Sequence, residues 1–346
     1  MISCSTSNSI RAAVLVPLFN AENRIAGLLE SLLAQTRLPD EIILVDDGSS
    51  DSSGVVVAGF AKRYPIIKYD YRANGGAASA RNAAWRMTTA DICVFTDDDC
   101  LPERNWLEEM LKPFADPGIG GVGGIYKTLR PDIRLAKFIG LELEYKYGLI
   151  EERVDCHPTA SLAVRRRLLE ALGGFNEKFG NPCADDWDLT YKLSARSRLV
   201  LQKTAVTGHL HPERLWPYLK SQYRRALNRI RLYREHPEKK RGDAYTDPRI
   251  PRRILSSAAF LGGFIFYPLV AARVLLLAGQ LFLFLGGLDF RFTLFLIKRD
   301  PATACYGVFV QSARNFAWLL GIATEWLRGL GNRGGKRERR AVGNGL

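Results

Sequence analysis

The stretch Glu41-Ile42-Ile43-Leu44-Val45-Asp46-Asp47-Gly48-Ser49-Ser50 joins a short apolar run to two aspartates and a turn. Such a run predicts a buried strand that ends where the aspartates begin. Similar runs occupy Ala12–Pro17, Ile66–Tyr71 and Ile92–Thr96, with helical apolar spacing between them. This βαβαβαβ series predicts an α/β fold, with a mostly parallel sheet and helices on both faces.

Polar clusters follow these strands at their carboxyl ends, where ligands of such sheets bind. Asp97, Asp98 and Asp99 come directly after one strand, and alternate carboxylates at such a place can hold a hard divalent ion that also contacts phosphate oxygens. A solvated acidic turn is the alternative. Asp46 and Asp47 could accept the imino N–H of a uracil-type base, or could form only a turn and a helix cap.

The charge balance favours a membrane over nucleic acid as partner. The 49 Lys and Arg exceed the 36 Asp and Glu, for a net charge of +13. The residues before Leu210 are nearly neutral, so the surplus lies beside the apolar stretch 254–288. Basic residues that flank apolar helices mark the cytoplasmic side of a membrane. The six cysteines form no CxxC pair, as expected in a reducing compartment.

The second half of the chain divides into four predicted segments. Residues 216–250 form a basic amphipathic segment beside the membrane, and residues 304–328 an amphipathic helix on the bilayer. Residues 254–297 form a transmembrane hairpin, with a re-entrant or interfacial pair as the alternative, because Asp289 and Arg291 are costly in hydrocarbon. Residues 329–346 form a basic flexible tail.

Six motifs in order resemble those of the family 2 glycosyltransferases, which have the GT-A fold. They are Val16-Pro17-Leu18-Phe19-Asn20, Val45-Asp46-Asp47-Gly48-Ser49-Ser50-Asp51, Gly75 with Ala80-Arg81-Asn82, Thr96-Asp97-Asp98-Asp99, Gly173-Gly174-Phe175 and Asp185-Asp186-Trp187-Asp188-Leu189. The resemblance implies a catalytic domain over residues 10–215, with its nucleotide-binding part ending near residue 110. The family transfers a sugar from a nucleotide diphosphate to an acceptor hydroxyl with inversion, usually with Mg²⁺ or Mn²⁺.

The resemblance also implies roles for residues on the donor side. Asp47 contacts the base and Arg81 faces the nucleotide. Asp97 and Asp99 match the outer carboxylates of the DxD motif and are the expected metal residues, with Asp99 favoured as the direct ligand. Asp97 and Asp98 are also expected to lie beside the nucleotide. The residues expected to line the nucleotide pocket are Pro17, Phe19 and Glu22.

On the acceptor side, Asp186 matches the general base of the family. Inversion in one step needs a base opposite the leaving diphosphate, and one carboxylate suffices. Asp185 replaces the usual Glu of the pair, and a charged helix start is the structural alternative for this cluster. Further candidate contacts to acceptor or sugar are Trp187, Ser161, His209, His211, Gln222 and Arg225, of which the two histidines could equally be structural.

We expect from these features a bacterial enzyme at the inner membrane, with its catalytic domain in the cytoplasm. It would move one sugar from a nucleotide-sugar donor, preferably a UDP-sugar, to a hydroxyl of a lipid-linked or cell-envelope glycan. One alternative is transfer to a polyprenyl phosphate, whose anionic nucleophile needs no strong base. Another is an inactive nucleotide-sugar binding module of a membrane assembly.

Overall fold

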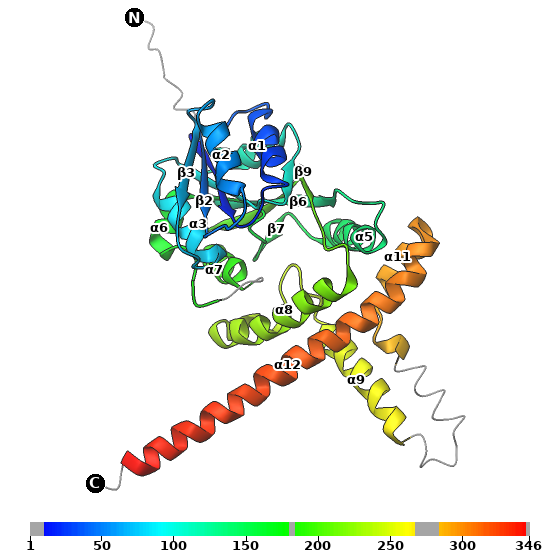
Figure 1. The fold of residues 1–346 in the computed structure, drawn as a ribbon. Coiled ribbons are helices and arrows are strands. Elements are labelled where there is room, and N and C mark those ends of the chain that lie inside the picture. The colour runs from blue at the N-terminus through cyan, green and yellow to red at the C-terminus, as the bar shows by residue number, and fades with distance from the viewer. Residues whose placement is uncertain (1–9, 180–183, 267–283, 344–346) are drawn as a thin grey trace, which may run out of the picture.

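The computed structural model describes residues 10–179, 184–266 and 284–343. A sheet with helices on both faces forms one end of the molecule, and a group of helices from the second half of the chain lies against it (Figure 1).

The first half of the sheet is parallel, as predicted. Strands β3, β2, β1 and β4 are neighbours in that order, and all three pairings are parallel. Continuous apolar runs suit such strands, because helices cover both faces of the sheet. The bounds are β1 Ala12–Leu18, β2 Glu41–Asp46, β3 Ile67–Tyr71 and β4 Ile92–Thr96.

The second half of the sheet is mixed, so the prediction of a mostly parallel sheet was wrong there. Strand β8 is antiparallel to both β4 and β6, and β9 pairs in parallel only with β6. The chain reaches β8 from the short strand β7 through a loop rather than through a helical crossover, so β8 can enter the sheet in the opposite direction. The bounds are β5 Cys100–Pro102, β6 Ile119–Thr128, β7 Arg153–Val154, β8 Ser161–Arg165 and β9 Arg198–His209.

Two apolar cores fill the two faces of the sheet. One lies under α1 (Ile25–Leu33), α2 (Ser53–Ala61) and α4 (Trp106–Leu111). The other lies under α3 (Ala77–Arg86), α6 (Arg166–Leu172) and α7 (Asp185–Ser194). This arrangement fixes the carboxyl ends of β1, β2 and β4 and the start of α7 around one space, as the strand order predicts.

Helix α5 (Arg134–Leu149) lies between the sheet and the helices of the second half of the chain and packs against both. Leu135 and Phe138 of α5 pack with Tyr218 of α8 and Phe292 of α11 in a third apolar core. The remaining helices are α8 (Leu215–Glu235), α9 (Ile250–Phe266), α11 (Phe290–Arg299) and α12 (Pro301–Gly343), with short 3-10 turns at Lys112–Ala115 and Pro237–Arg241.

Helix α12 is longer than the sequence predicts. It crosses beneath α8 and continues to Gly343, so the backbone is helical over most of the segment predicted as a flexible tail (Figure 1). Gly321 permits the close approach of the two helices, because a Cβ there would lie 2.7 Å from the Ala226 Cβ. The apolar face of α8 is therefore covered by protein.

The predicted hairpin 254–297 falls partly on residues 267–283, which lie outside the described residues. Within the three described ranges, no helix combines the length and the apolarity that crossing a bilayer requires.

Candidate functional site

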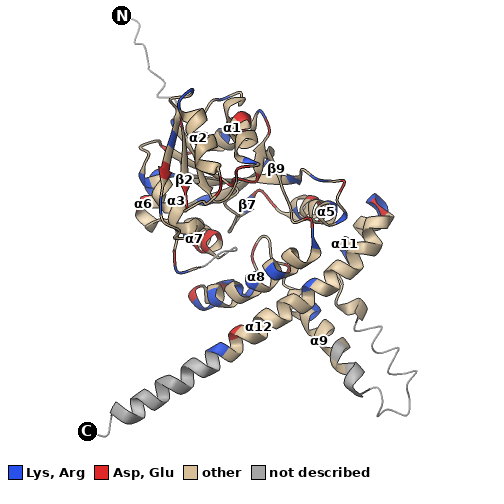
Figure 2. Ribbon diagram, in the orientation of Figure 1, with Lys and Arg blue, Asp and Glu red and all other residues tan. Residues whose placement is uncertain are grey.

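A cavity of about 1250 Å³ opens at the carboxyl ends of β1, β2 and β4 and extends to the helices of the second half. Strand ends and the start of α7 form one part of its wall, and α5, α8 and α12 form the other. Figure 2 shows acidic residues at the start of α7 and basic residues along α8 beneath it. The candidate residues that line the cavity are Pro17, Phe19, Asp47, Arg81, Asp97, Asp98, Asp99, Asp185, Asp186, Trp187, His209, His211, Gln222 and Arg225.

Two predicted site residues lie elsewhere. Ser161 is fully buried in β8, where its Oγ accepts a hydrogen bond of 2.8 Å from Trp106 Nε1. Glu22 accepts a hydrogen bond of 2.9 Å from the Ser52 backbone N–H at the start of α2. Neither residue lines the cavity. The acceptor or sugar contact at Ser161 and the nucleotide contact at Glu22 therefore stay predictions, which the described cavity wall does not include.

The carboxylate of Asp47 organises the loop that precedes α3. Its two oxygens accept hydrogen bonds of 2.7 and 2.9 Å from the backbone N–H groups of Gly75 and Gly76. The Asn74 side chain in turn donates to the Asp47 carbonyl at 2.9 Å. Asp47 thus lines the cavity and fixes the loop that precedes α3, and its contact to a base stays a prediction.

The three aspartates after β4 have three different environments. Asp97 accepts a hydrogen bond of 2.9 Å from Arg81, and Asp98 accepts one of 2.9 Å from Arg24 Nε. Burial raises the pKa of Asp98 to about 6, although the ion pair with Arg24 opposes this. Asp99 is the member whose carboxylate forms no ion pair with a Lys or Arg in the described part of the chain.

Asp99 and His209 form the candidate metal centre. The His209 Nε2 lies 3.6 Å from an Asp99 oxygen, and these atoms lie within 4.8 Å of the Cys100 sulfur. The strand pairing of Cys100 with His209 brings them together. The carboxylate suits Mn²⁺ or Mg²⁺, and the imidazole can add a nitrogen ligand to a transition metal such as Mn²⁺. Burial raises the pKa of the Cys100 thiol well above its usual value, which keeps that thiol neutral. The donor set therefore fits a divalent cation bound by Asp99 and His209.

Asp186 lies at the start of α7, buried to 6% exposure, and lines the cavity. Burial and the neighbouring Asp185 raise the pKa of Asp186 to about 7, against the opposing charge of Arg81. Asp185 instead accepts a hydrogen bond of 2.9 Å from Arg81. The two neighbouring carboxylates thus differ, since one is held in an ion pair and the other can exchange a proton near neutral pH.

The remaining candidates line the same cavity as Asp186. The His211 ring stacks on His209 at 4.7 Å, and burial lowers the pKa of His211 to about 3, so that ring is neutral. Gln222 accepts a hydrogen bond of 3.0 Å from Trp318 Nε1. The buried Trp187 Nε1 has no hydrogen-bond partner among the described residues, and the Arg229 guanidinium lies 5.3 Å from the Trp187 ring.

Several cavity residues escaped the sequence reasoning. Tyr126 and Tyr147 come from β6 and α5, Tyr245 from the segment before α9, and Arg314 from α12. No local motif marks these residues, because they meet only through the tertiary packing of distant segments. Cys100 could have been recognised, since it directly follows the aspartates.

The comparisons with known proteins agree with this geometry. Residues 13–169 match the model of the family described as "Glycosyl transferase family 2", so this part of the chain is a glycosyl transferase family 2 domain. The pre-mycofactocin glycosyltransferase of Mycobacterium tuberculosis is 27% identical over 237 residues, which cover 65% of this chain and 48% of that protein. EpsJ of Bacillus subtilis, described as an uncharacterized glycosyltransferase, is 40% identical over 116 residues, or 33% of this chain and 34% of EpsJ. The chain therefore spans about half or less of the length of these relatives.

Solved structures show the same fold. The mannosyltransferase PcManGT from Pyrobaculum calidifontis, in complex with GDP-Man and Mn²⁺, superposes with a TM-score of 0.59 at 23% identity, over 91% of this chain and 87% of that one. A GalNAc transferase solved with UDP, GalNAc and Mn²⁺ gives a TM-score of 0.52 at 15% identity, over 66% and 48% of the two chains. At sequence identities this low, the two structures show that the fold is shared.

Proposed function

We propose that this protein is an inverting, metal-dependent glycosyltransferase. It moves a single sugar from a nucleotide-diphosphate sugar, preferably a UDP-sugar, to a hydroxyl of a lipid-linked or cell-envelope glycan. The observation that carries the proposal is the position of Asp186, a buried carboxylate that shares one cavity with the aspartates after β4 and forms no ion pair with any described residue.

Asp186 is the general base of the proposed reaction. In its ionised form it accepts the proton of the acceptor hydroxyl as that oxygen attacks the anomeric carbon, and the bond to the nucleotide diphosphate breaks on the opposite face. A pKa of about 7 suits this role, because the group is ionised in part of the molecules at neutral pH and can still take up a proton. Asp185 cannot readily do the same, since Arg81 holds its carboxylate.

The donor half of the cavity consists of the strand ends. Asp47 and the Gly75-Gly76 loop bind the nucleoside, and Pro17 and Phe19 line its pocket. Asp99 and His209 would hold Mn²⁺ or Mg²⁺, which neutralises charge on the leaving diphosphate. Arg81 orients Asp97 beside this centre.

Donor binding tests the proposal without knowledge of the acceptor. Calorimetric titration of UDP, GDP and dTDP should show one preferred nucleotide, bound at least about tenfold more weakly without Mn²⁺. An Asp99→Asn variant should lose this dependence on the metal, whereas Asp132→Asn on the surface should retain it, because the Asp132 side chain is 63% exposed. Equal, metal-independent affinity for all three nucleotides would contradict the proposal.

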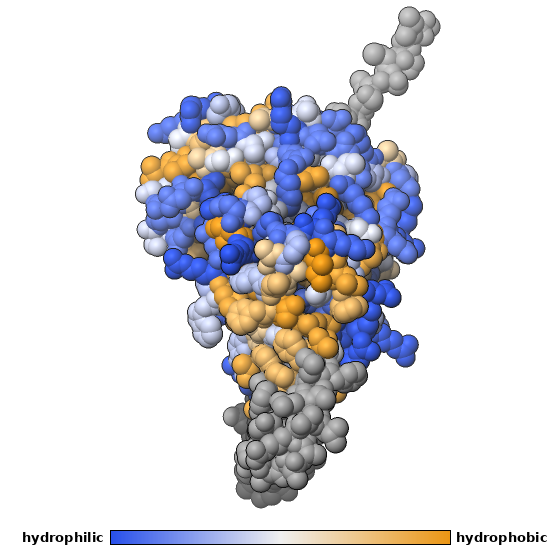
Figure 3. Space-filling view, turned by 90° about the vertical axis from the view of Figure 1, so that its right-hand side faces the viewer, coloured by the Kyte–Doolittle hydropathy of each residue, from blue (hydrophilic) through white to orange (hydrophobic). Residues whose placement is uncertain are grey.

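We also propose that the helical half lies on the cytoplasmic face of the inner membrane. Figure 3 shows hydrophobic surface gathered below the catalytic domain. Exposed apolar side chains occur on α9, α11 and α12, with cations at the ends of α11: they are Leu255, Phe290, Leu294, Ile297, Phe309 and Leu320, with Arg291, Lys298 and Arg299 beside them. Apolar burial together with attraction to anionic lipid favours such binding.

Vesicle flotation tests the membrane proposal. The full chain should float with vesicles of phosphatidylethanolamine and phosphatidylglycerol, and less with phosphatidylcholine alone. Phe309→Asp/Leu320→Asp should reduce flotation several-fold, because both side chains are more than half exposed on α12. Val55→Asp is the matched control on α2, where the side chain is 77% exposed. Equal loss with the control, or no loss with either, would contradict the proposed surface.

A further inference from the structure

The cavity has two halves of opposite charge. Its strand-end half contains the aspartates described above. Among the lining residues from α5, from α8 and from the chain after α8, eight are Lys or Arg and four are Asp or Glu. The helical half therefore has an excess of positive charge, although the proposed donor and its metal belong at the other half.

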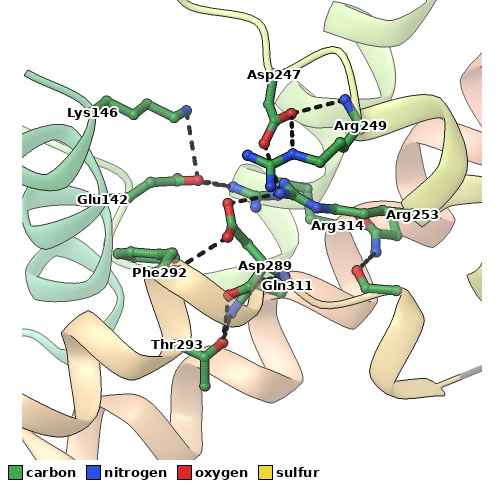
Figure 4. A network of polar contacts seen from close by, with 12 residues as sticks. Glu142, Lys146, Asp247, Arg249, Arg253, Asp289, Phe292, Thr293, Gln311 and Arg314 are labelled. Carbon is green, nitrogen blue, oxygen red and sulfur yellow. Dashed lines mark hydrogen bonds and ion pairs between the residues drawn. The ribbon is translucent and has the colours of Figure 1, made fainter. Parts of the chain in front are cut away.

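Each of the four carboxylates in the helical half already has a cationic partner. Arg314 donates to Glu142 at 2.6 Å, and Lys146 lies 3.6 Å from the same carboxylate. Arg253 bridges Asp247 and Asp289 at 2.7 and 3.0 Å (Figure 4). The fourth carboxylate, Asp243, accepts from Arg229 at 2.8 Å. None of these acidic groups is left to neutralise a further cation.

Three cations of α8 that face the cavity form no hydrogen bond or ion pair in the described part of the chain. They are Lys220, Arg224 and Arg225, here called the α8 cation cluster. Their spacing of four and five residues places them on adjacent turns of one helix, where like charges repel. Arg231 and Arg234, farther along α8 and outside the cavity wall, both pair with Glu325. Among the cations of α8, those without a partner in the described part of the chain all line the cavity.

The α8 cation cluster shares the cavity wall with the base and with apolar residues of α9 and α11. Arg225 lines the same cavity as Asp186 and His211, and its positive charge acts against protonation of both side chains. The cavity wall also includes Ile254 and Phe292, and Leu255 and Phe290, close to them in sequence, are exposed to 70% and 68%. One molecule bound in this cavity can therefore contact Asp186, the cation cluster and apolar side chains.

We propose that the α8 cation cluster binds the phosphate or diphosphate that joins the acceptor sugar to its lipid. This inference rests on the proposed function and specifies the acceptor: its hydroxyl lies at Asp186, its phosphate at α8 and its hydrocarbon chain along α9 and α11. Arg and Lys supply the charge-assisted hydrogen bonds that phosphate oxygens accept. The phosphate serves here as a binding group, and the hydroxyl is the nucleophile.

The experiment measures binding of farnesyl diphosphate to the full chain in detergent, with EDTA present so that the metal centre is empty. Farnesol and inorganic pyrophosphate are the matched probes, since farnesol has the hydrocarbon chain alone and pyrophosphate has the diphosphate alone. Farnesyl diphosphate should bind at least about tenfold more tightly than either, and affinity should fall as salt is raised. Saturating UDP should not displace it.

The variant Lys220→Gln/Arg224→Gln should weaken farnesyl diphosphate binding by at least about tenfold. Lys203→Gln/Arg214→Gln removes the same charge outside the cavity and should bind as wild type does. Unchanged affinity in the first variant would overturn the inference, as would displacement by UDP or equally tight binding of pyrophosphate. This readout needs neither donor nor turnover. Farnesyl diphosphate binding can therefore be absent while the transferase activity is present, and it can be present while the activity is absent.

Discussion

Arg81 and Asp185, 104 positions apart in the chain, form a buried ion pair of 2.9 Å that joins α3 to α7. The other terminal nitrogen of Arg81 donates to Asp97 after β4, also at 2.9 Å. One guanidinium thus connects the acidic turn of the donor half to the helix that positions the base. Although burial opposes it, the two carboxylates raise the pKa of Arg81, so this link persists at every physiological pH.

Replacing Arg81 should destabilise the fold. Arg81→Leu leaves the buried Asp185 without a cation, which should lower the free energy of unfolding by about 3–5 kcal/mol. Urea denaturation followed by circular dichroism measures this loss. Arg72→Leu is the control, since Arg72 forms an exposed pair with Asp70 and should change stability by less than about 1 kcal/mol. Similar losses in both variants would contradict the assigned role of Arg81.

The transfer rate should depend on pH through Asp186. Only the ionised carboxylate accepts a proton, so the rate should rise as pH increases toward about 7 and then level off. Initial rates of nucleotide release between about pH 5 and pH 9 measure this profile. A profile already flat at about pH 5 would mean that a group with an ordinary carboxyl pKa acts as the base.

The same pKa shift also predicts that the free energy of unfolding falls as pH rises, whereas the transfer rate rises. Because the folded state raises the pKa of Asp186 above its unfolded value of 3.8, folding disfavours ionisation. Below pH 3.8, the pKa of the unfolded state, Asp186 is protonated in both states and its titration does not change the free energy of unfolding. As pH rises from there to about 7, the titration of Asp186 lowers the free energy of unfolding progressively. Asp186→Asn should therefore be more stable than wild type at alkaline pH and little changed at acid pH. Denaturation curves at the two pH values test this, and a variant less stable at alkaline pH would contradict it.

Asp47 should contribute to nucleotide affinity through the loop that it orders. Asp47→Ala removes two hydrogen bonds to Gly75 and Gly76, which should cost about 1–3 kcal/mol and weaken nucleotide binding about tenfold or more. Calorimetry with the preferred nucleotide measures the loss. Asp70→Ala, at a partly exposed surface ion pair, should bind as wild type does. Unchanged affinity in Asp47→Ala would show that the loop needs no such support.

The local part of this architecture was predictable from the sequence, and the part that depends on distant packing was not. The runs around Val14, Leu44 and Val94 are apolar because helices cover both faces of their strands, so the parallel half of the sheet and its acidic edge follow from the pattern. Glu22 and Ser161 lie near functional motifs in sequence, yet backbone capping and core packing use their side chains. The sequence shows that Ser161 is a polar residue within a strand. It does not show that the Ser161 hydroxyl meets the indole of Trp106, which lies 55 positions away in the chain.

The residues of the cavity wall show the same limit of prediction from sequence. Gln222 and Arg225 are candidate contacts from the sequence alone, whereas Lys220 and Arg224 stand out only once α5 and α12 are placed around α8. Their lack of a partner depends on how Glu142, Asp247 and Asp289 are already paired. Such long-range pairing has no signal in a single sequence.

The most direct test of the central claim is nucleotide release from UDP-, GDP- and dTDP-sugars by detergent-purified protein supplied with a bacterial lipid extract. The account predicts Mn²⁺-dependent release from one donor, stimulated by the extract. Asp186→Asn should reduce that release by at least about a thousandfold while donor binding persists, because only the base is lost. The surface variant Asp132→Asn should match wild type. Extract-stimulated release that survives in Asp186→Asn would contradict the assignment of this residue as the base, and binding of no donor would contradict the site itself.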